Sequence, residues 1–117
     1  MSGHVELGRA GEAAAEGRYR HDGYEIVGRN VLLPGGEIDL IVTRGELVVF
    51  VEVKTRRSNR HGGGASAVDH RKQRRLRAAA AQWLAAHDGP WRPVRFDVVV
   101  ATPVGQAFTL ELITDAF

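Results

Sequence analysis

The chain has 117 residues, of which 44% are hydrophobic and 26% are charged, with a formal net charge of +2 and no cysteine. This composition predicts one soluble globular domain over residues 1–117, with a core from about 7 to 113, and excludes disulfides and thiolate-bound zinc. No apolar run approaches membrane-spanning length, and the N-terminus lacks a basic start and an apolar core, so we expect a cytoplasmic protein without a signal peptide or a membrane partner.

The Ala-rich segment Leu7–Arg20 predicts a first helix, which is weakened by three glycines and should end near Gly23. Ala15 and Tyr19 follow Glu12 at i+3 and i+7, so Glu12 should share the face that packs on a sheet. From periodicity alone, we expect this carboxyl to bond a neighbouring backbone N–H or an arginine.

A hairpin follows the first helix and a first strand. Residues 24–28 predict that strand, and residues 29–35, with a proline and two glycines, predict a connection. Residues 36–57 contain two apolar-rich stretches joined by a short turn, which predicts a β-hairpin with Arg44 and Gly45 as the central turn residues. One face of its second strand is wholly apolar and should pack into a core: Leu47, Val49, Val51 and Val53.

The hairpin gathers acidic side chains on its other face. With the predicted turn, Asp39 lies opposite Phe50, and the alternation of side chains puts Glu37, Asp39, Glu52 and Lys54 on one face. Asp39 and Glu52 are then diagonal neighbours with Cβ atoms roughly 7–8 Å apart, a gap that a divalent cation bound by both carboxylates can bridge. A salt-bridged strand end facing solvent is an equally supported interpretation of the same residues.

A second helix is predicted over residues 69–86, after a loop at 58–66 that contains three consecutive glycines. Its buried stripe consists of Leu76, Ala80, Trp83 and Leu84. Gln73 precedes Leu76 by three residues and should point inward near the helix start, with Lys72 beside it. Gln73 is therefore a candidate for supporting the acidic site, and a bond to the helix backbone is the alternative.

Two strands at 94–100 and 107–113 complete the predicted elements. The first is rich in β-branched residues and is expected inside the sheet. The five histidines show no metal-ligand spacing, and the chain has no phosphate-binding glycine motif. The acidic hairpin is therefore the main candidate for chemistry.

Basic residues concentrate in one part of the chain. Between residues 55 and 77 there is a single acid, against eight basic residues, which are Arg56, Arg57, Arg60, Arg71, Lys72, Arg74, Arg75 and Arg77. A basic half beside a carboxylate cluster indicates a polyanion such as nucleic acid, steered toward a metal-filled acidic site. A solvated, arginine-rich helix is the alternative.

The order of elements, with Asp39 followed by Glu52-Val53-Lys54, resembles the PD-(D/E)xK nuclease superfamily. A closer likeness, roughly from Gly8 to Val100, is to the YraN family of small bacterial proteins. The motifs that carry it are Gly8-Arg9-x-Gly11-Glu12, Gly23-Tyr24, Arg29-Asn30, Gly36-Glu37-Ile38-Asp39-Leu40-Ile41, Val49-Phe50-Val51-Glu52-Val53-Lys54-Thr55-Arg56, Arg71-Lys72-Gln73-Arg74-Arg75-Leu76 and Arg95-Phe96-Asp97-Val98. The chain departs from the family at Val31 and Leu32, where an aromatic and a basic residue are common, and Ile38 replaces the proline of the superfamily name.

The resemblance implies an α/β, three-layer domain with a mixed central sheet flanked by helices, as in restriction endonucleases. Because the family is similar to archaeal Holliday-junction resolvases, it implies a metal-dependent endonuclease that hydrolyses phosphodiester bonds in DNA, including branched DNA. Asp39, Glu52 and Glu12 would hold Mg²⁺ or Mn²⁺, which oxygen ligands favour over zinc. Lys54 would activate the attacking water, with Gln73 and Glu37 next to the ligands.

The basic residues would bind backbone phosphates: Arg56, Arg57, Arg60, Arg71, Lys72, Arg74 and Arg75. A nuclease-like module that binds nucleic acid without cutting it is the alternative, and an assembly protein in which the acids form only ion pairs is a third. The sequence leaves open whether the chain forms a homodimer.

Overall fold

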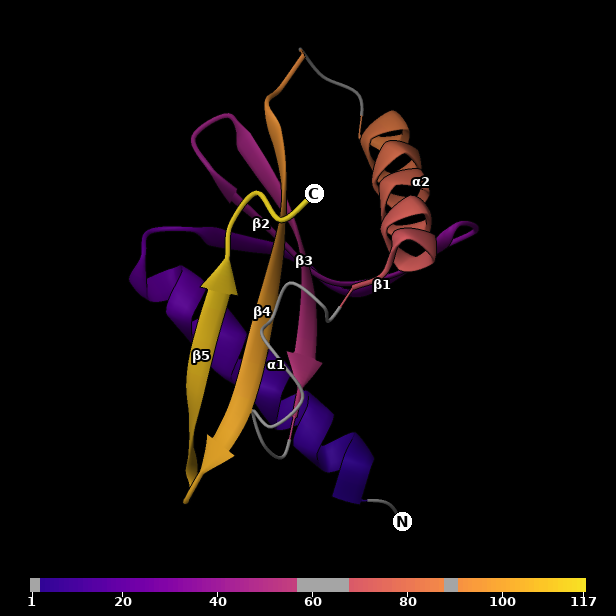
Figure 1. Ribbon diagram of the computed structural model, residues 1–117. Coiled ribbons are helices and arrows are strands. Elements are labelled where there is room, and N and C mark those ends of the chain that lie inside the picture. Colours follow the sequence, from indigo (N-terminus) through magenta and orange to yellow (C-terminus); the bar gives the residue numbers. More distant parts are fainter. Residues whose placement is uncertain (1–2, 57–67, 88–90) are drawn as a thin grey trace.

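The structure is a computed structural model that describes residues 3–56, 68–87 and 91–117 (Figure 1). In chain order its elements are α1 (Gly3–His21), β1 (Glu25–Leu33), β2 (Gly36–Arg44), β3 (Leu47–Thr55), α2 (His70–Ala86), β4 (Val94–Val104) and β5 (Ala107–Ile113). The predicted loop at 58–66 lies outside the described residues, as do Arg57 and Arg60.

The five strands form one mixed sheet in the order β1-β2-β3-β4-β5. The first three strands form an antiparallel meander, whereas β3 and β4 run parallel and are linked through α2. β5 closes the other edge as an antiparallel neighbour of β4. A parallel pair needs such a crossover connection, and the helix lies on a sheet face because of it.

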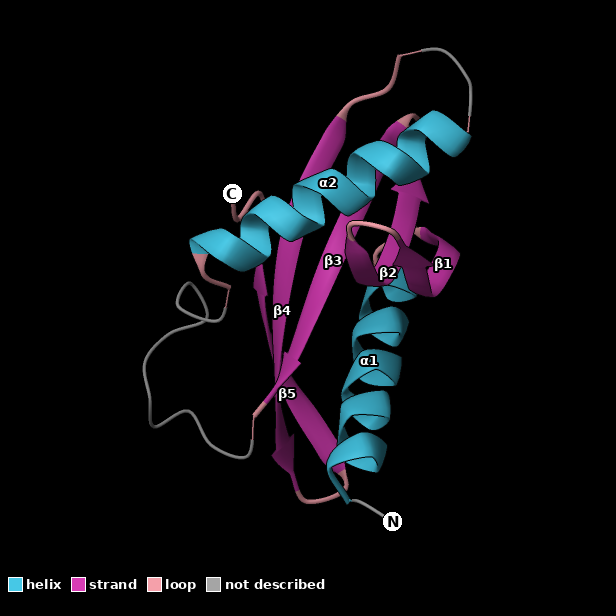
Figure 2. Cartoon of the chain, turned by 90° about the vertical axis from the view of Figure 1, so that its right-hand side faces the viewer, coloured by secondary structure: helices cyan, strands magenta, loops and turns pink. Residues whose placement is uncertain are grey.

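The two helices lie on opposite faces of the sheet (Figure 1, Figure 2), and each helix covers a separate apolar cluster. On one face, Ala15 and Tyr19 of α1 pack with Leu40, Val42, Val49, Val51 and Val53. On the other face, Leu76, Ala79, Ala80 and Trp83 of α2 pack with Ile41, Val48 and Phe50. The molecule is therefore a three-layer α/β domain, which confirms the predicted fold class and both predicted helix stripes.

The predicted hairpin register is wrong by two residues. Arg44 pairs with Leu47, so the turn is made by Gly45 and Glu46, and Ile41 rather than Asp39 lies opposite Phe50. Gly45 has a φ of +59°, the left-handed conformation that a type II′ turn requires at its first central residue. The glycine therefore sets the turn. A register error of two residues does not by itself move a side chain to the other face, because the strand period is two.

The predicted connection at 29–35 is instead mostly strand, because β1 runs on to Leu33 and pairs with the start of β2. Pro34 and Gly35 alone form the turn. The Gly35 N–H donates to Oε1 of Gln82 at 2.8 Å, which docks this turn on α2. A Cβ at Gly35 would come within 3.1 Å of Ala79 backbone, so glycine permits the close approach.

A fully buried carboxylate ties α1 to the sheet. Asp97 has no exposed surface and accepts hydrogen bonds from the Tyr19 hydroxyl at 2.7 Å and from Arg95 at 2.8 Å. The backbone N–H of Asp115 donates to the same carboxylate at 3.1 Å. Burial and the charge of Asp97 raise the pKa of Tyr19 well above its ordinary value, so its hydroxyl stays a donor. This network fixes the helix that carries Glu12.

The structured part extends beyond the predicted limits of 7 and 113. The first helix begins at Gly3, and Ala116 and Phe117 pack against the cluster under α2. Within the described ranges, no helix has the length and apolar character needed to cross a membrane.

Candidate active site

The candidate site lies where β2 and β3 separate. Their backbone pairing extends to Leu40 opposite Val51. Beyond this pair, Oδ2 of Asp39 accepts the Val53 N–H at 2.9 Å. The Asp39 side chain thus accepts a hydrogen bond that a backbone carbonyl of β2 would accept in a regular ladder. Asp39 and Glu52 therefore stand at the point where the two strands diverge and a pocket opens.

A twist in β2 turns Asp39 toward this opening. Residues two apart on a strand normally share a face, yet Ile38 belongs to the cluster under α2 and Leu40 belongs to the cluster under α1. The strand therefore rotates between these residues. Asp39 lies at the rotation and borders hollows on both sides of the sheet.

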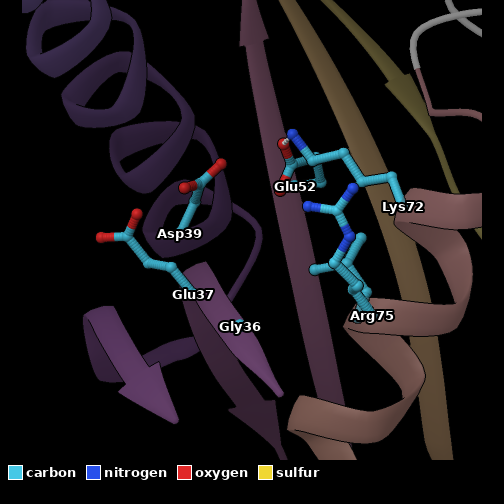
Figure 3. Close-up of a pocket in the computed structure, with 7 residues that line it drawn as sticks. Gly36, Glu37, Asp39, Glu52, Lys72 and Arg75 are labelled. Carbon is cyan, nitrogen blue, oxygen red and sulfur yellow. Dashed lines mark ion pairs between the residues drawn. The ribbon is translucent and has the colours of Figure 1, made fainter. Parts of the chain in front are cut away.

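The pocket on the α2 side has acids on one wall and bases on the other. Its volume is about 200 Å³, and it is lined by Gly36, Glu37, Asp39, Glu52, Lys72, Arg75 and Leu76. Figure 3 shows Lys72 and Arg75 reaching from α2 toward Glu52, while Glu37 and Asp39 project from β2. Since one water occupies about 30 Å³ in the liquid, the pocket has room for a hydrated cation beside a phosphate group.

The carboxyl groups of Asp39 and Glu52 are close enough to share a proton. Burial, followed by the charge of Asp39, raises the pKa of Glu52 to about 7. Burial also raises the pKa of Asp39, although the hydrogen bond from the Val53 N–H opposes this. The proximity of the half-buried Asp39 to the buried Glu52 disfavours double ionisation, and a dication between them would offset that penalty.

Lys72 forms an ion pair with the carboxyl of Glu52, the more deeply buried of the two acids. Its Nζ lies 2.6 Å from Oε2 of Glu52. Partial burial acts to lower the pKa of Lys72, but the hydrogen bond and charge of Glu52 outweigh it, so the pKa is raised. Lys72 was predicted only as a phosphate contact, and the structure places it at the carboxylate pair.

Glu12 approaches Asp39 from the other side of the sheet. It lines a second pocket of about 270 Å³ together with Arg29, Asn30 and Asp39, whereas Glu52 does not border this pocket. Burial and the charge of Asp39 raise the pKa of Glu12, and a hydrogen bond from Asn30 opposes the rise. The structure thus brings Glu12 to Asp39 but keeps it apart from the pocket that holds Glu52.

The other predicted residues occupy different positions. Lys54 follows Glu52 on the same face of β3 but is exposed and does not line the pocket. The Gln73 side chain donates to the Val68 carbonyl at 3.1 Å. This is a hydrogen bond to the backbone, which was the alternative to a role in supporting the acidic site. Glu37 is exposed on the pocket wall.

Three of the predicted phosphate-binding arginines lie on α2. Arg71, Arg74 and Arg75 are exposed, and Arg75 also lines the pocket. Arg56 follows β3, and its backbone N–H donates to the Ala101 carbonyl at 2.8 Å. The structure therefore gathers basic side chains on the same side of the sheet as the Asp39–Glu52 pair.

Asn30 is a site residue that the sequence analysis did not single out. Its φ is +48°, a conformation that asparagine tolerates better than most residues, and its side chain bonds Glu12. The Arg29-Asn30 pair was visible in the sequence, but asparagine is common in turns. Its role beside an acid emerges only from the fold, which brings Asn30 of β1 and Glu12 of α1 to the same pocket.

The described residues contain no group of three Asp, Glu, His or Cys side chains already arranged around one metal position. The carboxyls that line the α2-side pocket are those of Asp39 and Glu52, with the exposed Glu37 on the same wall. Mg²⁺ suits such a site, since it often binds through one or two carboxylates and completes its shell with water and substrate phosphate.

Comparison with known proteins places the chain in a family. The model of the Uncharacterised protein family UPF0102 matches residues 11–101. A UPF0102 protein of Xanthomonas campestris is 47% identical over 113 residues, covering 96% of this chain and 91% of the relative. A UPF0102 protein of Rhodococcus jostii is 43% identical with both chains fully covered, and one of Symbiobacterium thermophilum is 48% identical over 83% of this chain and 82% of its own. The chain therefore belongs to the uncharacterised family UPF0102, the YraN family that its motifs had indicated.

Proposed function

We propose that this protein is a metal-dependent endonuclease that hydrolyses phosphodiester bonds in DNA at the Asp39–Glu52 pair. One observation carries the proposal: the buried Glu52 and the half-buried Asp39, on neighbouring strands, face a pocket whose opposite wall is basic. The acidic wall suits a divalent cation, and Lys72 and Arg75 suit a phosphate group. A single pocket therefore offers a place for each charged participant in phosphodiester hydrolysis.

The chemistry of the donors fits Mg²⁺ or Mn²⁺. Both side chains offer carboxylate oxygens, which these cations prefer and which do not select zinc. Burial, followed by the charge of Asp39, raises the pKa of Glu52, and a bound dication would favour the ionised carboxyl against both effects. When bound, the metal supplies a Lewis acid that polarises the phosphate and lowers the pKa of a coordinated water.

The residues of the chain then have separate tasks. Asp39 is oriented by the Val53 N–H and, with Glu52, would hold the cation. Arg75 would bind the phosphate from α2, and Glu12 adds negative charge from the far side of Asp39. The family resemblance assigns Lys54 to the attacking water, and its place two residues after Glu52 on the same face is compatible with that task.

The choice of DNA rests on two supports. Exposed arginines on α2 can contact successive phosphates without reading sequence. The similarity of the family to Holliday-junction resolvases favours branched substrates.

Incubation of the purified protein with branched, single-stranded and duplex DNA, in Mg²⁺ or Mn²⁺, tests the proposal. We expect cleavage of at least one substrate, with loss of cleavage and retained DNA binding in Asp39→Asn. Asparagine keeps an oxygen for the Val53 N–H but removes the charge, so this variant should fold. A Glu46→Gln variant on the distant β2–β3 turn serves as the control and should cut like the parent.

A non-catalytic nucleic-acid-binding module is the second candidate. The Lys72–Glu52 ion pair favours it, because a lysine already neutralises the carboxyl that the metal would need. This candidate predicts DNA binding with no cleavage under either metal. Such a result with every substrate would discard the nuclease assignment.

A further inference from the structure

The Lys72–Glu52 ion pair joins two side chains with very different access to solvent. The Lys72 side chain is 46% exposed, whereas that of Glu52 is 6% exposed. A lysine ammonium ends a flexible stem with several rotatable bonds, while Glu52 is anchored on an interior strand. Lys72 is therefore the partner that can leave the pair.

The backbone position of Lys72 is an unusual place for a cation. The cap residue Asp69 accepts the Lys72 N–H at 2.9 Å, and no acid follows in the first turn of α2. The N-terminal end of a helix dipole favours anions and disfavours cations. Lys72 stands in this turn together with Arg71, and its ammonium is held by the contact with Glu52.

A divalent cation bound between Asp39 and Glu52 requires the same Glu52 carboxyl that Lys72 holds. Two cations cannot both keep a close contact with that group without repelling each other. The ammonium also borders the space that a phosphate would enter, because Lys72 and Arg75 form the basic wall of the pocket. One side chain, Lys72, would thus face both the metal and the phosphate (its reach toward Glu52 is drawn in Figure 3).

We propose that Lys72 is a resident counter-ion that a divalent metal displaces from Glu52, and that the displaced ammonium binds a substrate phosphate. Metal and phosphate then bind cooperatively. The metal frees the Lys72 ammonium for the phosphate, and the phosphate draws Lys72 away from Glu52, which frees that carboxyl for the metal. The proposal rests on the proposed function and describes how that site is controlled. Reciprocity requires that DNA strengthens metal binding by the same factor by which metal strengthens DNA binding.

Titration calorimetry of the full chain with Mn²⁺ alone tests the displacement. Lys72→Gln should bind Mn²⁺ about tenfold more tightly than the parent, because the competing ammonium is gone, within the usual range of such couplings. Arg75→Gln is the matched control, since it removes a positive charge from the same pocket without removing the ion pair. If both variants bind Mn²⁺ more tightly by the same factor, the gain comes from the loss of any positive charge near the site, and the proposal is overturned.

A second titration adds a short single-stranded phosphorothioate oligodeoxynucleotide as the phosphate probe. In the parent, the probe should tighten Mn²⁺ binding about tenfold, and in Lys72→Gln this coupling should largely disappear. An unchanged coupling in the variant would overturn the proposal. Lys72→Arg keeps the charge and can hold Glu52 in a bidentate contact, so it should bind Mn²⁺ no more tightly than the parent.

Thermal melts keep the test decisive if Lys72→Gln is unstable. Removing Lys72 leaves the buried Glu52 carboxyl without its partner, which is destabilising, so this variant should melt below the parent in chelator, and Mn²⁺ should restore most of the difference. Failure of Mn²⁺ to restore it would contradict the displacement. Mn²⁺ binding that Asp39→Asn abolishes but Lys72→Gln leaves unchanged would refute only this inference, whereas absence of Mn²⁺ binding from all variants would refute the metal site as well.

Discussion

Gly11 of α1 lies directly against the side chain of Thr55 at the end of β3. A Cβ at Gly11 would collide with Oγ1 of Thr55 and crowd its Cβ and Cγ2. Gly11 precedes Glu12, so this close approach holds a site carboxylate near the sheet. The glycine is required here by the closeness of the Thr55 side chain and not by its own torsion angles, because Gly11 is helical.

We expect Gly11→Ala to destabilise the protein by about 1–3 kcal/mol, as overpacking commonly does. Gly8→Ala is the matched control on the same helix, since a Cβ there meets nothing within 4 Å. It should stabilise the protein by about 0.5–1 kcal/mol through helix propensity. Urea unfolding of both variants checks the difference. If Thr55→Ala fails to recover part of the loss in Gly11→Ala, the contact is not the cause.

Tyr19→Phe should cost about 1.5–3 kcal/mol, the range for a hydrogen bond to a charged group. The change removes one donor from the fully buried Asp97 and leaves the ring packing intact. Tyr24→Phe is the comparison, because Tyr24 accepts a bond from Arg95 and makes no bond to Asp97 itself. Chemical denaturation measures both. Equal losses in the two variants would contradict a special role for the Tyr19 hydroxyl.

The stability of the metal-free protein should fall as pH rises. The folded-state pKa of Glu52 is about 7, above its ordinary value, so the folded chain holds a proton that the unfolded chain releases. Stability from this group is present below the ordinary pKa and is lost as pH rises through 7. We expect a loss of up to about 3 kcal/mol between roughly pH 5 and pH 8 in chelator.

Glu52→Gln provides the control for this pH dependence, because glutamine cannot ionise. Its unfolding free energy should be nearly flat over the same interval, apart from a smaller slope from Asp39, whose pKa is also raised. Saturating Mg²⁺ should flatten the profile of the parent as well, since the dication replaces the proton between the carboxyls. A parent profile in chelator that rises with pH would contradict the assignment.

Reversal of Arg71 and Arg74 to Glu should weaken DNA binding and flatten its dependence on salt. Both arginines are exposed on α2, and each lost phosphate contact removes roughly 0.7–0.9 from the logarithmic salt slope. Lys54→Ala should instead abolish cleavage and leave DNA affinity within about tenfold of the parent. Fluorescence anisotropy at several salt concentrations separates the two. An unchanged slope in the reversal variant would place the DNA elsewhere.

The sequence by itself determined the two helices, the acidic hairpin face and the apolar stripes. These features are periodic and local: Ala15 and Tyr19 repeat at helical spacing, and Val49, Val51 and Val53 alternate along a strand. The same alternation put Asp39 and Glu52 on one face even though the register was wrong by two residues. Periodicity therefore predicted the shared face of Glu37, Asp39 and Glu52, which line the pocket, but also put Lys54 on that face, and Lys54 does not line it.

Only the tertiary structure decided which charges meet. The Lys72–Glu52 pair joins a helix to a strand across the crossover connection, and no local pattern encodes that distance. The local pattern favoured Lys54, which the structure leaves exposed beside the site. The burial of Asp97 was likewise signalled only by its place in an apolar strand, and its partners come from α1 and the C-terminal segment. Contacts between distant segments depend on how the layers pack, because side chains there meet through the fold and not through their spacing in the chain.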